Sequence, residues 1–276
     1  MNAIPRLLDE RQSNYSSAFE RSLSPEVLRA QVPAVFAPSA HERLSGSYSF
    51  LPTARVLEAL GQAGFLPVEA RQTRARVRSA LHARHLIRLR RRLEIVSLRQ
   101  GIPELLLLNS HDGTSAYQLR VGLYRAVCTN GLVVSVGVFP AIRALHRGDV
   151  LEDVVRGALE MSERFGLLAT AVERMERTEL DERQRLEFAA EAIALRFPND
   201  RQGAMSPSQL LVPRRPEDVG TDLWRVFNVI QEAVLAGGLV RRSATNRLTR
   251  SRRITAIGED IRLNSALWDM AMARAV

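Results

Sequence analysis

The sequence predicts an α+β protein: an antiparallel sheet with arginine-lined strands, a long helix packed on one face, and a helical C-terminal part. Three observations predict this fold class. Arginines of one parity follow Gln72, as on one face of a strand. Asn130-Gly131 separates two apolar runs, which is a strong hairpin signal. After Pro140 the apolar residues recur at helical spacing.

The first half of the chain predicts an arm, a short helix and a series of strands. Residues 1–45 are punctuated by Ser and Pro and indicate a flexible N-terminal arm. Thr53 is suited to cap a short helix that ends at Gly61 and Gly64. A turn is expected at 101–103 and a buried strand at 104–108. The other predicted strands lie at 72–78, 86–93, 95–98, 117–128 and 132–138.

The second half predicts helices. Asp149 is suited to cap a helix that runs to about 176, and a second helix is expected from about 179 to the residue before Phe197-Pro198. Residues 198–220 hold four prolines and two glycines, which indicates a linker or a surface excursion. Thr221 or Asp222 would cap the next helix. The predicted domains are therefore the arm, an α+β core at 46–197, the segment 198–220, and a helical segment with a basic loop at 221–276.

Composition limits the classes of protein. The hydrophobic fraction of 46% is enough for a core, and no stretch of 18 uncharged apolar residues predicts a transmembrane helix. The N-terminus lacks an apolar signal region and Cys128 is the single cysteine, so a cytoplasmic protein is expected. No P-loop, glycine-rich dinucleotide motif or paired Cys/His spacing occurs, so no cofactor and no metal are predicted.

Charge is the most informative property of the sequence. All 39 basic residues are arginine, a residue whose planar fork of donors suits phosphate. Residues 70–93 hold nine arginines and no acid, and residues 239–258 hold six arginines and no acid. The remaining 24 arginines face 30 acidic residues, so the rest of the chain carries a net −6. This segregation predicts a polyanionic partner, with nucleic acid the first choice.

The candidate nucleic-acid-binding residues lie in these two basic strips. Arginines two apart on a strand project from one face about 7 Å apart, close to the spacing of successive phosphates. The alternative is a solvated sheet face, or an interface with the acidic helices. The candidates are Arg71, Arg74, Arg76, Arg78, Arg84, Arg88, Arg90, Arg92, Arg241, Arg250, Arg252 and Arg253.

Residues 109–113 (N-S-H-D-G) are the best candidate for chemistry. His111 and Asp112, with His146 elsewhere, would be able to hold a divalent metal, or His111 to act as a general base. The simpler interpretation is a turn between two strands. No catalytic residue is therefore predicted. Trp224, Phe227 and Trp268 stand at helical spacing, where core positions are more common than base-stacking platforms.

Four strings occur together in order: G-S-Y-S-F-L-P from Gly46, L-N-S-H-D-G from Leu108, G-L-Y-R-A-V-C-T-N-G-L-V-V from Gly122, and D-L-W-R-V-F-N-V-I-Q-E-A-V-L-A-G-G from Asp222. With them the chain resembles the phage/plasmid-like proteins of domain-of-unknown-function family 932 over about 45–270. The resemblance implies a mobile-element origin and carries no established activity. The order of elements also resembles, at the level of fold alone, the single-strand annealing recombinases.

The sequence therefore predicts a single-stranded DNA-binding protein of phage or plasmid recombination or replication, with annealing as a further step. Annealing needs a basic groove and no catalytic residue, and a homo-oligomer is compatible with it. No membrane partner is expected. Two alternatives stay open at this point: a metal-dependent nuclease that uses His111 and Asp112, and an interaction protein that targets a host factor.

Overall fold

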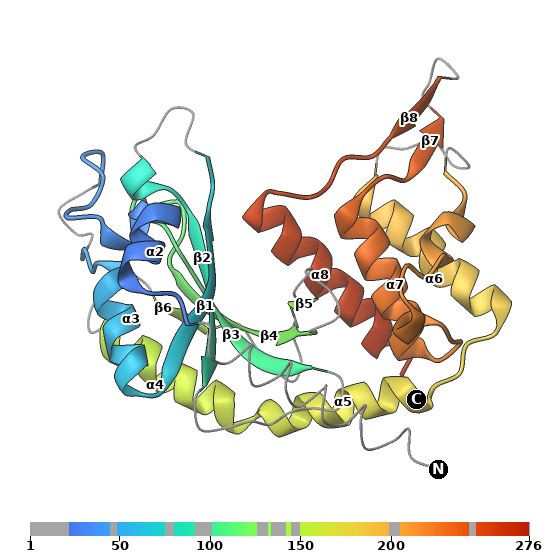
Figure 1. Cartoon of the computed structure of the whole chain (residues 1–276), viewed down its shortest axis with the longest axis horizontal. Coiled ribbons are helices and arrows are strands. Elements are labelled where there is room, and N and C mark those ends of the chain that lie inside the picture. The colour runs from blue at the N-terminus through green and yellow to red at the C-terminus, as the bar shows by residue number, and fades with distance from the viewer. Residues whose placement is uncertain are drawn as a thin grey trace, which may run out of the picture. The chain divides into compact units, whose positions relative to one another are not determined.

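The computed structural model describes residues 22–44, 49–74, 80–91, 101–125, 132–133, 142–144, 150–198, 205–242 and 247–275. These residues form helices and an antiparallel sheet, which confirms the predicted α+β class (Figure 1). The chain divides into two compact units. The first comprises residues 1–132 and 139–165, and the second comprises residues 133–138 and 166–276.

The first unit is built on a six-stranded sheet with the strand order β1-β2-β3-β4-β5, in which β6 also pairs with β4. Strand β1 pairs with β2, β2 with β3 and β3 with β4, each time antiparallel, and every residue of β3 is buried. The strands are β1 (Phe65–Gln72), β2 (His85–Arg91), β3 (Ile102–Asn109), β4 (Tyr117–Tyr124), β5 (Leu132–Val133) and β6 (Ile142–Ala144).

Helices α3 and α4 pack on the same face of this sheet. The Thr53 hydroxyl of α3 lies 2.9 Å from His85 Nε2, and Ser162 of α4 accepts a hydrogen bond from Arg91. His85 and Arg91 have the same parity in β2 and therefore share a face, whereas Arg88 and Arg90 lie on the opposite one. The helices of this unit are α2 (Pro25–Gln31), η1 (Pro33–Phe36), α3 (Thr53–Gln62), η2 (Ala80–His82) and α4 (Val150–Glu163).

Two predicted boundaries in the sheet are wrong. A strand was expected at 72–78, but strand β1 covers Phe65–Gln72 and so ends where the predicted strand begins. Strand β1 lies at an edge of the sheet and has a bulge between Pro67 and Glu69, where the missing N–H of a proline is tolerated. The turn expected at 101–103 is wrong because β3 already begins at Ile102. The strand at 95–98 and the Asn130-Gly131 turn lie outside the described residues.

The second unit is helical and carries a small hairpin. Helix α7 is its centre, since from Leu223 to Leu235 only Arg225 is exposed. Trp224, Phe227 and Trp268 pack together with ring centroids 5.9 and 6.0 Å apart, which confirms them as core. The elements are α5 (Phe165–Arg177), α6 (Glu182–Arg196), η3 (Pro207–Leu211), η4 (Pro216–Asp218), α7 (Leu223–Ala236), β7 (Val240–Arg242), β8 (Leu248–Arg250) and α8 (Ile257–Met272).

Capping residues place the ends of α6 and α7 close to the predicted positions. Asp181 and Gln184 form a reciprocal capping box at the start of α6. Asp222 caps α7 by accepting the Arg225 N–H, and Gly237 closes that helix at φ +74°.

One other expectation for the second half is corrected. The helix predicted to run to about 176 is two helices, α4 and α5, which are interrupted at Arg164. Within the segment 198–220, for which a linker or a surface excursion was expected, the described residues 205–220 form η3 and η4 in the second unit, and Leu210 is buried. No helix in the described ranges has the length and apolar character needed to cross a bilayer.

Candidate nucleic-acid interface

Two candidate arginines of the first basic strip are buried in ion pairs. Arg88 Nε donates to Glu104 Oε2 at 2.5 Å, and Arg90 Nε donates to Glu104 Oε1 at 2.7 Å. Leu89 pairs with Leu105 across β2 and β3, which brings the three charged residues to the same face. Arg88 is 2% exposed, Arg90 is 5% exposed and Glu104 is fully buried. The assignment of Arg88 and Arg90 to a solvent-facing phosphate site is therefore wrong.

The described residues in the rest of that strip offer little exposed charge. Arg71 is half-buried, and so is Arg84, whose Nη2 donates to the Thr114 carbonyl at 3.0 Å. Arg74 is the only exposed arginine among the described residues of 71–91. The candidates Arg76, Arg78 and Arg92 lie outside the described residues.

The second strip forms what we call the basic arm, residues 240–253: the antiparallel hairpin β7–β8 and the three residues that follow it. Arg242 pairs with Leu248 and Val240 with Arg250 across the hairpin, which extends beyond helices α6 and α7 of its unit (Figure 1). Arg241 is half-buried, with its guanidinium over the Phe197 ring at 5.5 Å. The exposed arginines of the arm are Arg242, Arg247, Arg250, Arg252 and Arg253.

Hydrogen bonds hold the base of the arm on the helical unit. The Gly238 N–H donates to the Ser251 carbonyl and the Ser251 N–H to the Leu239 carbonyl, both at 2.9 Å. The Gln209 side chain of η3 forms two further bonds of 2.9 Å with the backbone N–H and carbonyl of Val240. The arm therefore leaves its unit in a defined direction.

Two residues at the C-terminus of α6 form a stacked support under the arm. The guanidinium of Arg196 lies 5.0 Å from the Phe197 ring, which Arg241 also contacts. Arg196 also donates to the Arg252 carbonyl. Burial lowers the pKa of Arg196, and the charge of Glu259 partly offsets this. Arg196 is therefore a structural support of the arm.

The 109–113 segment is a turn, as the simpler interpretation predicted. Asp112 Oδ1 accepts hydrogen bonds from the Thr114 N–H at 2.9 Å and from the Thr114 hydroxyl at 2.5 Å. Gly113 has φ +77°, and a Cβ at that position would lie 2.5 Å from Leu44 Cδ2. His111 points into the core and is fully buried.

Buried polar groups surround the Thr53 hydroxyl. His85 Nδ1 lies 2.9 Å from the Ala83 carbonyl and must donate to it, so the neutral ring accepts the Thr53 proton at Nε2. The Thr53 oxygen then accepts from Asn109 Nδ2 and His111 Nε2, both at 3.2 Å. Burial lowers the pKa of His85 to about 4, although the bond to Ala83 opposes this shift. The network joins α3 to the sheet.

This network does not support the nuclease alternative. Thr53, His85 and His111 are fully buried, so water and substrate do not reach them. No group of three His, Cys, Asp or Glu side chains suited to a metal ion occurs among the described residues. His146 and Cys128 lie outside those residues.

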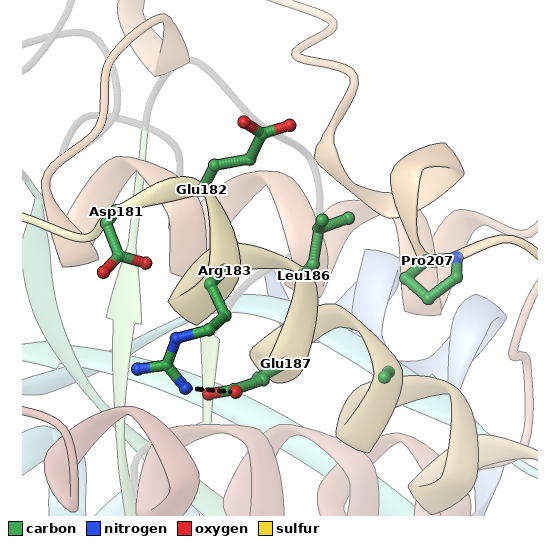
Figure 2. Close-up of a pocket in the computed structure, with 7 residues that line it drawn as sticks. Asp181, Glu182, Arg183, Leu186, Glu187 and Pro207 are labelled. Carbon is green, nitrogen blue, oxygen red and sulfur yellow. Dashed lines mark hydrogen bonds and ion pairs between the residues drawn. The ribbon is translucent and has the colours of Figure 1, made fainter.

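A shallow hollow of about 740 Å³ lies along α6 of the second unit, beside Pro207 (Figure 2). Leu186 lines it, as does Arg183, which is paired with Glu187 at 2.6 Å. Asp181 and Glu182 add two more carboxylates. An acidic wall of this kind repels phosphate, so the hollow is not part of the candidate interface.

The fold and the site define an α+β protein of two units whose helical unit presents an arginine-rich hairpin. The chain belongs to the DUF932 family, because the family model described as "Domain of unknown function (DUF932)" matches residues 40–268. UPF0380 protein YfjQ of Escherichia coli (strain K12) is 40% identical over 253 residues, with 91% of each chain covered. UPF0380 protein YafZ of the same strain is 40% identical over 255 residues, with 92% of each covered. No solved structure matches the chain.

Two exposed arginines of the arm were not among the candidate binding residues predicted from the sequence. Arg242 and Arg247 were not in it, although both are exposed there. The segment was predicted as a loop. A prediction of a hairpin would have placed alternate residues on one face, namely Val240, Arg242, Leu248 and Arg250. The burial of Arg88 and Arg90 depends on the carboxylate of Glu104 on strand β3. The sequence around the two arginines does not indicate that partner.

Proposed function

We propose that this chain binds nucleic acid through the basic arm, in the replication or recombination of phage or plasmid DNA. The observation that carries the proposal is the exposure of five arginines on one short, anchored element that contains no acidic residue. The resemblance to phage and plasmid proteins supplies the biological setting.

The physical basis of the binding is phosphate neutralisation. Each guanidinium presents several N–H donors in a fork that matches phosphate oxygens, and each neutralised phosphate releases condensed counterions. The rest of the chain has a net negative charge once the two basic strips are removed. It therefore repels a polyanion elsewhere and favours approach to the arm.

We place the main contact at the arm, whose exposed arginines the structure describes. The preference for single-stranded DNA rested on a row of arginines along one strand face. Arg88 and Arg90 of that row are buried on Glu104, and Arg74 follows the end of β1. Nucleic acid is therefore bound by the helical unit.

The test compares two variants of the full chain that lose the same charge. In the arm variant, Arg242, Arg250 and Arg252 become Ala; in the control variant, Arg156, Arg177 and Arg183 become Ala. The control arginines have side chains that are 60%, 80% and 73% exposed on helices, each beside a carboxylate. Fluorescence anisotropy with labelled single-stranded DNA, duplex DNA and RNA measures the affinity.

We expect the wild type and the control to bind at least one of these nucleic acids, and the arm variant to bind it at least tenfold more weakly. Equal losses in both variants would show that only the total charge matters. The absence of binding to all three probes at low salt would overturn the proposal.

A further inference from the structure

The two faces of the β7–β8 ribbon differ in what they contact. Alternate residues of a strand point to opposite faces, so Arg241 and Thr249 share one face. Arg241 contacts Phe197, and this face is therefore turned toward the helical unit. The other face carries Arg242, Leu248 and Arg250, all three exposed.

Leu248 is an unusual residue to find on that outer face. It is 61% exposed, pairs directly with Arg242 across the hairpin, and lies two residues from Arg250 on its own strand. A large apolar side chain between two cations on an exposed ribbon cannot neutralise a phosphate. It is able to pack on an apolar surface that lies between phosphates, and the stacked bases of a nucleic acid are such a surface.

The shape and composition of the arm favour a duplex over a single strand. A two-stranded β-ribbon has dimensions that fit a groove of double-stranded DNA. Residues 240–253 contain no aromatic side chain, whereas single-strand binders commonly stack bases on aromatic rings. Proteins that bind the minor groove commonly combine arginines with an apolar wedge, often Leu, that unstacks one base step and bends the DNA.

We infer that the ribbon enters a groove of duplex DNA, that Arg242 and Arg250 bind the phosphates on its two sides, and that Leu248 inserts between base pairs and bends the duplex. This inference rests on the proposed function and specifies the form of its ligand. The arm is then an element that deforms DNA, and sequence preference follows from how easily a base step unstacks.

The experiment uses the full chain and a duplex of about 30 base pairs with a fluorescent donor and acceptor at its ends. Energy transfer measures the bend, and anisotropy on the duplex and on each of its single strands measures affinity. The variants are Leu248→Ala, Leu248→Phe and, as a matched control, Val212→Ala, which truncates a side chain that is 63% exposed elsewhere in the same unit.

We expect the wild type to bind the duplex more tightly than either single strand and to bend it by roughly 20–90°. Leu248→Ala should lose most of the bend while affinity changes less, because removing the wedge also removes the cost of unstacking. Leu248→Phe and Val212→Ala should keep the bend.

Two results would overturn the inference while leaving the proposed function intact. One is tighter binding to the single strands than to the duplex. The other is a duplex that stays straight, or bends equally with Leu248→Ala. A failure to bind any of the probes would instead overturn the proposed function itself.

Discussion

Glu104 compensates two buried positive charges with one carboxylate. A buried ion pair costs desolvation energy that its attraction barely offsets, so the group has most effect when one partner is removed. Arg88 and Arg90 each use their Nε–H on a different Glu104 oxygen, and Arg90 also lies over the Tyr124 ring at 4.1 Å. These contacts fix the register of β2 and β3 on this face of the sheet.

Glu104→Gln should therefore lower the free energy of unfolding by about 3–5 kcal/mol, because it leaves two buried guanidinium charges without their carboxylate. The matched control is Glu69→Gln. Glu69 lies 3.9 Å from Arg88 Nε, but its side chain is 47% exposed, so its loss should cost less than about 1 kcal/mol. Urea denaturation followed by circular dichroism measures both. Similar losses from the two variants would contradict the assigned role of Glu104.

His85 predicts a loss of stability in mild acid. Its pKa is about 4 in the folded chain, against an ordinary value of 6.5 when unfolded. Above pH 6.5 both states are neutral and the group has no effect. As the pH falls from 6.5 to 4, His85 binds a proton in the unfolded chain but not in the folded chain. The free energy of unfolding therefore falls by on the order of 3 kcal/mol.

The measurement is urea unfolding of the wild type and of His85→Gln at pH 7, 5.5 and 4. Other groups titrate in this range, so the difference between the two proteins isolates His85. The variant should be less stable at pH 7, because Thr53 and Ala83 lose their partner, and the gap should narrow toward pH 4. A gap that stays constant would show that His85 has the same pKa in the folded and the unfolded chain.

Local signals predicted the helices better than the strands. Asp181 with Gln184, and Asp222 with Gly237, mark helix ends by bonds to nearby backbone, so the sequence alone places them. Strand β1 contains Pro67 and is stabilised by pairing with β2, a strand that lies further along the chain. The residues of β1 alone therefore do not reveal that it is a strand. Arg88 is buried because it pairs with Glu104, which is 16 residues away in the sequence. The structure therefore agrees with the predicted fold class better than with the predicted binding residues.

At the scale of elements, Gly237 connects helix α7 to the basic arm. It has φ +74°, and a Cβ there would lie 2.7 Å from the backbone carbonyl of Arg252. Gly238 is a matched control, since it has φ +83° but open space around the position of a Cβ. The left-handed backbone alone costs an L-residue roughly 1–2 kcal/mol.

Gly237→Ala should thus destabilise the chain by more than Gly238→Ala and should also weaken nucleic-acid binding, because the clash displaces the backbone at 252–253. Gly238→Ala should lower stability by roughly 1–2 kcal/mol and leave binding nearly unchanged. Thermal unfolding and anisotropy, measured on the same preparations, separate the two effects. Unchanged binding by a folded Gly237→Ala protein would show that the position of the arm is unimportant.

At the scale of the whole molecule, the two basic strips have different physical roles. The first is contained partly within the sheet, where Arg88 and Arg90 hold a buried carboxylate and Arg91 donates to Ser162. The second is exposed on the helical unit. The net charge of +9 is therefore a poor measure of the positive charge exposed to a ligand, because some of the arginines are buried in ion pairs.

The dependence of binding on salt tests this difference. Five exposed arginines lie in the arm, and each phosphate that they neutralise adds about −0.9 to the slope of log K against log salt concentration on duplex DNA. A slope near −5 is expected if the arm supplies nearly all contacts. Each exposed arm arginine changed to Ala should reduce its magnitude by about 1, whereas Arg156→Ala or Arg183→Ala should leave it unchanged. A much steeper slope that survives loss of the arm arginines would place the main contact on the other strip, at Arg74 and the arginines that follow it.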